Sequence, residues 1–298
     1  MNQYKSGYIS IIVLPNAGKS TLMNQLLGQK LAIVSPRPQT TRNRILGVKT
    51  LPEAQCIFID TPGICRPRNV LDKKMLRTTR ESLKEVDLVL WMTAADTILR
   101  DKGQLREIAE TLKPSPKPIF LLLNKIDLIP DKNQLLPLID ELSKWLNFAE
   151  IIPISAFQSE NLSLLLEKLP LHLPEGPKYF PDDFVTDQPE RFLLAEIIRE
   201  KLYYHTHQEI PYSCAVALEN MQEAEEQNLL RMQAVIYVEQ DSQKKIVIGK
   251  GGSLIKKVGT QARLEMEQIL GCRVFLDLWV KVRKDWRQEE SFINLVGY

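Results

Sequence analysis

The first half of the chain alternates short apolar runs with amphipathic stretches, and this alternation limits the folds that it can adopt. Five apolar runs bounded by turn residues predict buried strands, at residues 8–13, 55–59, 87–92, 118–123 and 150–154. Amphipathic stretches predict helices, at residues 19–27, 70–86, 102–112, 134–147 and 162–169. An extra strand is expected near residues 45–50. Since such units pair strands through right-handed crossovers, the sequence predicts an α/β domain with a mostly parallel sheet and helices on both faces.

The chain changes character near residue 170, because five prolines and Gly176 fall between Pro170 and Pro189. Proline lacks a backbone N–H and fixes φ, so an extended linker is expected over residues 174–187. Beyond it the pattern predicts a helix, two strands, a helix and a strand, at residues 188–204, 212–219, 229–239, 253–270 and 273–282. The predicted division is a domain at residues 1–173 and a small α+β domain at residues 188–298.

Composition excludes several classes of protein. The 298 residues include 39 Lys and Arg against 37 Asp and Glu, a net charge of +2, so any nucleic-acid surface must be local. The four cysteines form no CxxC pair, which disfavours a disulfide framework or zinc ribbon and favours a reducing cytosol. No stretch approaches ~18 consecutive apolar residues, so no membrane-spanning helix is expected. Glutamates near residues 221–230 predict an exposed acidic loop.

A glycine–lysine–serine motif stands between the first predicted strand and the first predicted helix, where a phosphate-binding loop belongs. Backbone N–H groups at a helix start lack intrahelical partners and attract phosphate oxygens. Gly18 permits close backbone approach, Lys19 places a cation against the β- and γ-phosphates, and the Ser20 hydroxyl suits Mg²⁺. The expected loop comprises Pro15, Asn16, Ala17, Gly18, Lys19, Ser20 and Thr21. Val13 replaces the usual first glycine, which leaves a degenerate nucleotide site as an alternative.

An acidic turn follows the second of the five predicted strands. Asp60 begins the run Asp-Thr-Pro-Gly, and a carboxylate at the carboxyl end of a strand can hold Mg²⁺ through water. The N–H of Gly63 can reach a γ-phosphate, so this turn is expected to sense whether that group is present.

A third signal indicates which base is bound. Asn124-Lys125-Ile126-Asp127 follows the fourth strand, and Ser155-Ala156 follows the fifth. The Asp127 carboxylate can accept from both guanine donors, N1–H and N2–H₂, which adenine lacks. Lys125 is expected to cover the base, Asn124 to brace the phosphate loop, and a backbone N–H near Ser155 or Ala156 to meet guanine O6. Ligands of such sheets bind at the carboxyl ends of strands, so these signals together predict a GTP site rather than an ATP-using kinase or ATPase.

The second domain contains the run Gly249-Lys250-Gly251-Gly252, expected between an apolar strand and an amphipathic helix. Glycine without Cβ lets a turn press against a sugar–phosphate backbone, which is how KH modules clamp about four nucleotides. Residues 241–287 hold eleven Lys or Arg against five Asp or Glu, as expected for an RNA-binding face. The predicted RNA contacts are Ile248, Gly249, Lys250, Gly251, Gly252, Ile255, Lys256 and Lys257.

These residues resemble a known family. Residues 15–22, the run Pro36-Arg37-Pro38-Gln39-Thr40-Thr41-Arg42 and the turn at Asp60 are similar to the Era-like bacterial GTPases, of the translation-factor-related class. Residues 191–202, 248–252 and 278–282 match the second domain of that family. The resemblance implies an α/β P-loop GTPase domain followed by an α+β type II KH domain.

The resemblance also implies roles for single residues. Residues 39–42 would form switch I, with Thr41, or Thr40 in its place, ligating Mg²⁺ beside Ser20 and Asp60. Catalysis would rest on Lys19, Thr41 and Gly63, and Asn16 matches an asparagine that holds K⁺ in related GTPases. Ile64 stands where Ras-type proteins carry a water-positioning glutamine, so slow intrinsic hydrolysis is expected.

The partners implied by the resemblance are GTP and GDP, the 3′ end of small-subunit ribosomal RNA and the 30S subunit during its maturation. A cytoplasmic monomer with peripheral contact to the inner membrane is expected. Two rival interpretations stay open. One is an RNA-binding assembly factor with a degenerate nucleotide site, and the other is a sister GTPase with a KH-like tail that acts on the other ribosomal subunit.

Overall fold

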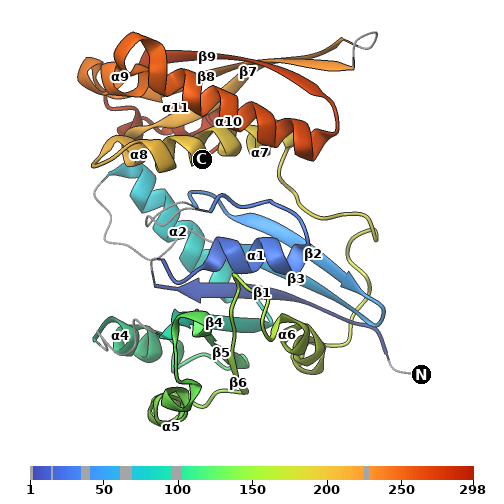
Figure 1. Cartoon of the computed structure of the whole chain (residues 1–298). Helices are drawn as coiled ribbons and strands as arrows, with labels where there is room; N and C mark the ends of the chain where they lie inside the picture. The colour runs from blue at the N-terminus through green and yellow to red at the C-terminus, as the bar shows by residue number, and fades with distance from the viewer. Residues whose placement is uncertain (1–2, 15, 35–40, 61–68, 96–102, 225–227) are drawn as a thin grey trace. The chain divides into compact units, whose positions relative to one another are not determined.

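The computed structural model describes residues 3–14, 16–34, 41–60, 69–95, 103–224 and 228–298 (Figure 1). The expected site residues Pro15 and Gly63, residues 39 and 40 of the expected switch segment, and Ile64 lie outside these ranges. The chain divides into two compact units. Unit 1 comprises Met1–Ala32, Thr41–Cys65 and Met75–Asp187, and unit 2 comprises Ile33–Thr40, Arg66–Lys74 and Gln188–Tyr298.

Unit 1 is built on a six-stranded sheet, in the order β2-β3-β1-β4-β5-β6. Its strands are β1 (Lys5–Val13), β2 (Ile45–Leu51), β3 (Ala54–Asp60), β4 (Leu88–Ala94), β5 (Ile119–Asn124) and β6 (Glu150–Pro153). Every neighbouring pair is parallel except β2 and β3, which form an antiparallel pair at one edge. The predicted mostly parallel sheet is therefore confirmed, including its extra strand.

Helices connect these strands, as the right-handed crossover rule requires. They are α1 (Lys19–Leu27), α2 (Val70–Lys84), α4 (Gly103–Leu112), α5 (Leu135–Ser143) and α6 (Leu162–Lys168). The predicted bounds of α1 are confirmed, whereas α5 ends four residues before the predicted residue 147. Its last turn is tightened by backbone hydrogen bonds that span three residues rather than four. They run from Lys144 N–H to Glu141 O and from Trp145 N–H to Leu142 O.

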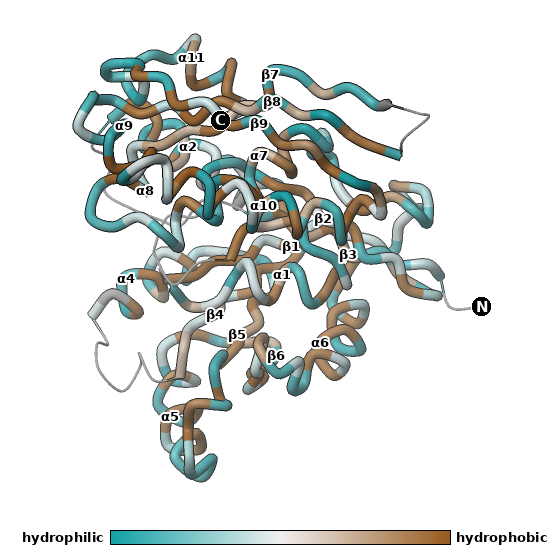
Figure 2. The backbone as a smooth tube through the Cα atoms, turned by 45° about the horizontal axis from the view of Figure 1, so that its top comes forward, coloured by the Kyte–Doolittle hydropathy of each residue, from teal (hydrophilic) through white to brown (hydrophobic). Residues whose placement is uncertain are grey.

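The sheet is buried on both faces. All residues of β4 and β5 are buried, which explains their nearly continuous apolar sequence, and Figure 2 shows hydrophobic residues along these strands. On one face, Trp91 and Leu121 belong to a cluster completed by α4 and α5. Near the edge, α1 packs close to β2 because residue 47 is glycine. A Cβ there would lie 2.5 Å from Leu27 Cδ1 and 2.6 Å from Met23 Cε.

The proline-rich stretch lies against the sheet of unit 1. The fully buried Gln55 donates from Nε2 to the carbonyl oxygen of Phe180 (2.9 Å) and accepts at Oε1 from the N–H groups of Tyr179 (2.9 Å) and Phe180 (3.0 Å). Farther along, Val48 N–H donates to the Val185 carbonyl oxygen (2.8 Å), so the stretch pairs with β2. An extended conformation is what its prolines favour.

Unit 2 contains a three-stranded sheet, in the order β7-β8-β9. Its elements are α7 (Glu190–His205), α8 (Ile210–Ser213), β7 (Ala215–Ala224), β8 (Leu229–Val238), α9 (Asp241–Ile248), α10 (Ser253–Leu270), β9 (Arg273–Val282) and α11 (Glu290–Leu295). Strands β7 and β8 are antiparallel, and β8 and β9 are parallel. Within the described residues, no helix has the length and hydropathy that crossing a membrane requires.

Three expectations for this unit are wrong. Tyr212 and Ser213 lie in α8 rather than in a strand, because Pro211 occupies the first turn of a helix, a position that tolerates its missing N–H. Most of the expected acidic loop is the β7–β8 hairpin, since β7 runs to Ala224 and β8 begins at Leu229. The apolar strand expected before the GxxG run is the helix α9.

Candidate functional site

The phosphate-type loop joins β1 to α1. Ala17 N–H donates to the Leu14 carbonyl oxygen (3.2 Å), and Leu22 N–H closes the first helical turn on Gly18 O (2.9 Å). Gly18 precedes α1 with φ +99°, a left-handed conformation that favours glycine. This geometry places Lys19 and Ser20 in the first turn of α1, where N–H groups lack intrahelical partners.

The amide of Asn124 joins three of the predicted segments. Its Nδ2 donates to the Ala17 carbonyl oxygen (2.7 Å), and its Oδ1 accepts from Ala156 N–H (2.9 Å). The side chain is almost fully buried. It also lies directly against Gly18, where a Cβ would stand 2.5 Å from Nδ2. Asn124 thus fixes the positions of the phosphate loop and of the loop after β6 relative to β5.

A buried cluster of a lysine, an aspartate and a threonine lies at the carboxyl end of β3. Lys19 Nζ is 2.7 Å from Asp60 Oδ1, and the Thr41 hydroxyl donates to Asp60 Oδ2 (3.1 Å). Asp60 is fully buried and Lys19 is 8% exposed, so the ion pair is shielded from solvent. The hydroxyl and carboxylate oxygens of Ser20, Thr41 and Asp60 are hard ligands of the kind that Mg²⁺ requires, so this donor set fits the ion.

The base side of the site is formed after β5. Lys125 has a left-handed conformation (φ 63°) and leads into a short turn, Ile126–Leu128, that contains the half-buried Asp127. The fully buried Ser155 donates from Oγ to Asp127 Oδ1 (2.6 Å). This hydrogen bond leaves the second carboxylate oxygen for another donor and restrains the side chain. Sequence reasoning assigned only a backbone role to Ser155 and missed this one.

Asn24 is a second residue that the sequence analysis missed. It lies on α1, and its Oδ1 accepts from the N–H groups of Leu31 and Ala32 (2.9 Å each), while its Nδ2 donates to Ala32 O (2.8 Å). The side chain thereby fixes the loop that follows α1 and leads toward the expected switch segment. No local motif marks such a role, because it depends on the path of the loop.

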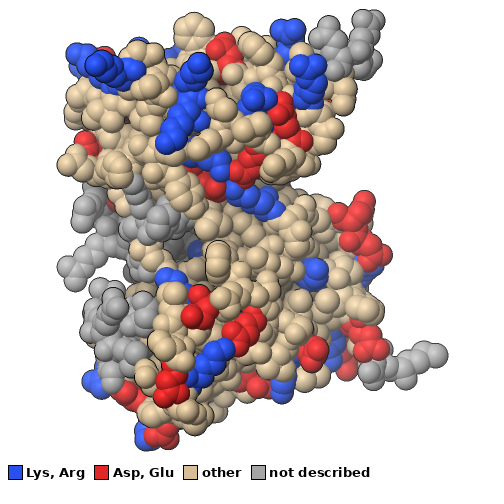
Figure 3. Space-filling model, viewed as in Figure 1, with Lys and Arg blue, Asp and Glu red and all other residues tan. Residues whose placement is uncertain are grey.

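The GxxG run of unit 2 forms a tight turn between α9 and α10. Gly249 ends α9 with φ +76°, and Gly251 and Gly252 have φ +60° and +80°. A Cβ at either of the last two would meet nothing within 4 Å, so the turn is open to a ligand backbone. Of the flanking predicted contacts, Lys250, Lys256 and Lys257 are exposed, whereas Ile248 and Ile255 are half-buried. Figure 3 shows that Lys and Arg gather on this helical face of unit 2.

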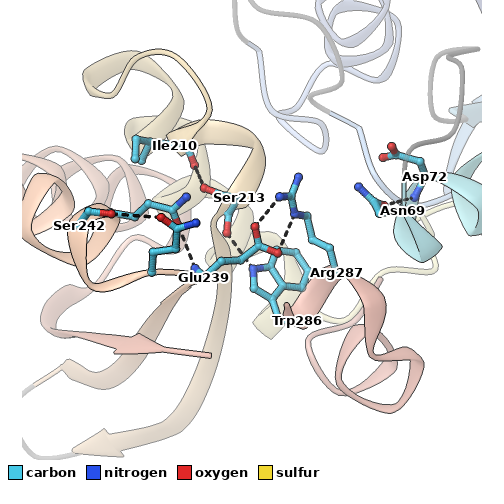
Figure 4. Close-up of polar contacts among 10 residues, drawn as sticks. Asn69, Asp72, Ile210, Ser213, Glu239, Ser242, Trp286 and Arg287 are labelled. Carbon is cyan, nitrogen blue, oxygen red and sulfur yellow. Dashed lines mark hydrogen bonds and ion pairs between the residues drawn. The ribbon is translucent and has the colours of Figure 1, made fainter. Parts of the chain in front are cut away.

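Polar contacts order the start of α9 and the segments beside it (Figure 4). The buried Gln243 accepts at Oε1 from the N–H of Glu239 (2.9 Å), an arrangement close to a capping box at the helix start. The Glu239 carboxylate in turn forms an ion pair with Arg287, and the neighbouring Trp286 donates from Nε1 to Ser213 O (2.8 Å). The Gln243 contact stabilises the start of α9, and the β-branched run before Gly249 continues this helix rather than forming a strand.

Comparisons with known proteins agree with this geometry. A family described as "50S ribosome-binding GTPase" matches residues 8–125, and a family described as "KH domain" matches residues 209–287. The chain is 50% identical to GTPase Era of Syntrophus aciditrophicus over 295 residues, covering 99% of this chain and 95% of that protein. It is 48% identical to GTPase Era of Staphylococcus haemolyticus, covering 100% and 98%.

Solved structures give the same result. A crystal structure of Era in complex with MgGDPNP and nucleotides 1506–1542 of 16S ribosomal RNA matches with a TM-score of 0.93 and 44% identity, covering 99% of both chains. An Aquifex aeolicus Era variant bound to GDP and AlF₄⁻ matches equally well. Because curated relatives and solved structures match over essentially the whole length, the chain belongs to the Era family of GTPases.

Proposed function

We propose that this chain is a GTP-binding and GTP-hydrolysing switch that binds the 3′ end of small-subunit ribosomal RNA and assists 30S maturation. The observation that carries the proposal is that one chain holds both the buried cluster around Asp60 and the open glycine turn before α10. The relative solved with MgGDPNP and a 16S ribosomal RNA fragment supports the same pairing of ligands. GTP and GDP would bind at residues 1–173, and RNA at residues 188–298.

The nucleotide would be held by the loop from Pro15 to Thr21 together with Asn124. We assign Mg²⁺ to Ser20, Thr41 and Asp60, where it would supply positive charge beside the β- and γ-phosphates. Lys19, now paired with Asp60, is the cation that would contact the phosphates. Gly63 keeps its proposed role as the γ-phosphate sensor.

Val13, the basis of the degenerate-site alternative, is a packed residue of the sheet. It is the last residue of β1, pairs with Met92 of β4 and is 7% exposed, so it packs in the sheet. Valine favours such a strand position. The turn after it still reaches the glycine–lysine–serine run, so we expect GTP to bind.

Guanine selection is assigned to Asp127. An Asp127→Asn variant replaces one accepting oxygen with an NH₂ donor, so it should lose preference for guanine and gain preference for xanthine, whose C2 carbonyl accepts. Titration with GTP and XTP measures this ratio. Asp131→Asn is the matched control, because Asp131 caps a turn nearby and should leave the ratio unchanged. Unchanged selectivity in Asp127→Asn would count against the assignment.

The RNA groove is assigned to Ile248, Gly249, Lys250, Gly251, Gly252, Ile255, Lys256 and Lys257. Gly251→Asp should weaken RNA binding and leave GTP binding intact, because it sets a negative charge and a side chain where the phosphates would pass. Gly271→Asp is the matched control, since Gly271 also has a positive φ and open space but ends α10 at its other terminus. Equal RNA affinity in the two variants would place the groove elsewhere.

Three finer proposals rest on the family resemblance. Asn16, exposed at φ 64°, is assigned to K⁺, and equal turnover in KCl and NaCl would remove that role. Ile64 cannot orient water by hydrogen bonding, so slow intrinsic hydrolysis is expected. A cytoplasmic monomer with peripheral membrane contact is proposed, and fractionation of cells with sizing of the purified protein tests it.

A further inference from the structure

The sheet of unit 2 has one face covered by helices and one face that is partly open. Alternate residues of β8 and β9, such as Met232, Ile236 and Val274, belong to the core formed with α7 and α10. Figure 1 shows α9 and α10 on this side of the three strands. The odd-numbered residues of both strands therefore point to the opposite face, because side chains alternate along a strand.

Part of this opposite face is covered by α11. The buried Phe292 of α11 packs edge-on against Tyr237 of β8, with 4.9 Å between ring centroids. Arg283, just after β9, lies over the Phe292 ring, with its guanidinium carbon 4.1 Å from the ring centroid. These contacts cover the opposite face around Tyr237 and Arg283, at the carboxyl ends of β8 and β9.

Two large aromatic side chains are exposed on this opposite face, Phe275 in the amino-terminal half of β9 and Trp279 just past the middle of the strand. Phe275 and Trp279 of β9 are 54% and 59% exposed, although burial of aromatic rings is strongly favourable. Arg231 of β8 is the register partner of Phe275, and its guanidinium lies 5.6 Å from the ring centroid. Trp279 donates from Nε1 to Asp277 Oδ2 (2.8 Å), which restrains the indole.

We propose that Arg231, Phe275 and Trp279 form a stacking surface, the aromatic face, for bases of single-stranded RNA that extends beyond the GxxG groove. The inference rests on the proposed RNA-binding function and deepens it. Exposed rings with a neighbouring guanidinium are the platform on which proteins stack unpaired bases. Four residues of strand separate the two rings by ~13 Å, so each can hold a different base.

The path from groove to aromatic face crosses a single strand. β9 is the edge strand of the sheet, and its Leu278 packs against Gly259 of α10, so close that a Cβ at Gly259 would lie 3.1 Å from Leu278 Cδ1. Trp279, the next residue, points to the other side. An RNA strand that leaves the groove would therefore pass around the edge of β9 to reach the aromatic face.

The same residues disfavour a protein or a bilayer as the occupant. Phe275 and Trp279 are separated by a carboxylate, Asp277, and flanked by Arg231 and Arg273, so the rings do not merge into one apolar patch. Protein-binding and membrane-binding faces expose contiguous apolar surface. Separate rings with arginine side chains beside them suit stacked bases and their phosphates.

The test uses the full chain and two RNAs with one shared groove sequence, one of about five nucleotides and one of about twelve. Trp279→Ala and Phe275→Ala should each weaken binding of the longer RNA by about fivefold to about a hundredfold and leave the shorter RNA unchanged. Tyr204→Ala is the control, because Tyr204 is an exposed aromatic (46%) on α7 of the same unit.

Tryptophan fluorescence supplies a second readout. Of the four tryptophans, Trp91 and Trp286 are fully buried and Trp145 is half-buried in unit 1, away from the proposed RNA-binding residues of unit 2. Quenching by the longer RNA should therefore come chiefly from Trp279 and be lost in Trp279→Phe, which keeps a stacking ring and most of the affinity. Equal affinity of Trp279→Ala and the unchanged protein for the longer RNA would overturn the proposal. The proposal would also be overturned if the alanine variants lost affinity equally for both RNAs. It would likewise be overturned if they lost only binding to anionic vesicles. Loss of both RNAs in Gly251→Asp supports the groove separately, so failure of the groove and failure of the aromatic face are distinguishable.

Discussion

Replacing Gly18 by alanine should destabilise unit 1 through its contact with Asn124. The new Cβ would stand 2.5 Å from Asn124 Nδ2, and the residue would keep a φ of +99°. Asn124 must then move, and the buried Ala17 carbonyl and Ala156 N–H lose their partner. Asn124→Ala removes the same two hydrogen bonds without the clash.

The expected sizes follow from these contacts. Each orphaned buried group costs about 1–3 kcal/mol, and a left-handed alanine costs about 1–2 kcal/mol. We expect Gly18→Ala to cost about 4 kcal/mol and Asn124→Ala about 3 kcal/mol. Because both break the same two bonds, the double variant should cost little more than Gly18→Ala alone. The coupling free energy should therefore be about 3 kcal/mol, far above the ~0.5 kcal/mol of independent sites.

The assay is hydrogen exchange at increasing urea without nucleotide, read from peptides of β5 so that only unfolding of unit 1 is measured. Peptides of β8 in unit 2 serve as the internal control and should not change. Additive costs of the two single variants would refute the reasoning, because they would show that Gly18 and Asn124 act on unfolding independently.

Three further predictions follow from buried groups of unit 1. Gln55→Leu should unpair the backbone at Phe180 and speed proteolytic cleavage of the proline-rich stretch severalfold, which timed digestion with mass spectrometry measures; unchanged cleavage would contradict the anchoring role. Burial raises the pKa of the Cys56 thiol to about 12, so at pH 8 it stays protonated and should resist iodoacetamide in the folded protein, whereas the partly exposed Cys272 should react; equal labelling would disprove this. Ser155→Ala frees the Asp127 carboxylate and should lower GTP affinity about tenfold with no change in the GTP-to-XTP ratio, measured by titration.

Much of this architecture could be predicted because sequence pattern and fold agree locally. The bounds of α1, α10 and β9 match the predicted ones. Glycines with positive φ mark the helix ends: Gly18 precedes α1, Gly252 precedes α10, and Gly271 follows α10 and separates it from β9. The helix α9 could not be predicted from its apolar run, because Gln243 stabilises its start through a contact with Glu239. The hydroxyl of Ser155 was missed for a similar reason, since its contact with Asp127 joins two loops 28 residues apart.

The proline-rich stretch alongside β2 has a practical consequence for dividing the protein. β2 is the outer strand of its sheet, and Val185 and Asp187 pair with the N–H groups of Val48 and Leu46. A recombinant fragment that stops at residue 173 would leave these N–H groups of β2 unpaired. Unpaired strand edges of this kind promote aggregation with other chains. Fragments that continue to residue 187 retain the segment that pairs with β2, so they should remain monodisperse at concentrations where the shorter ones precipitate.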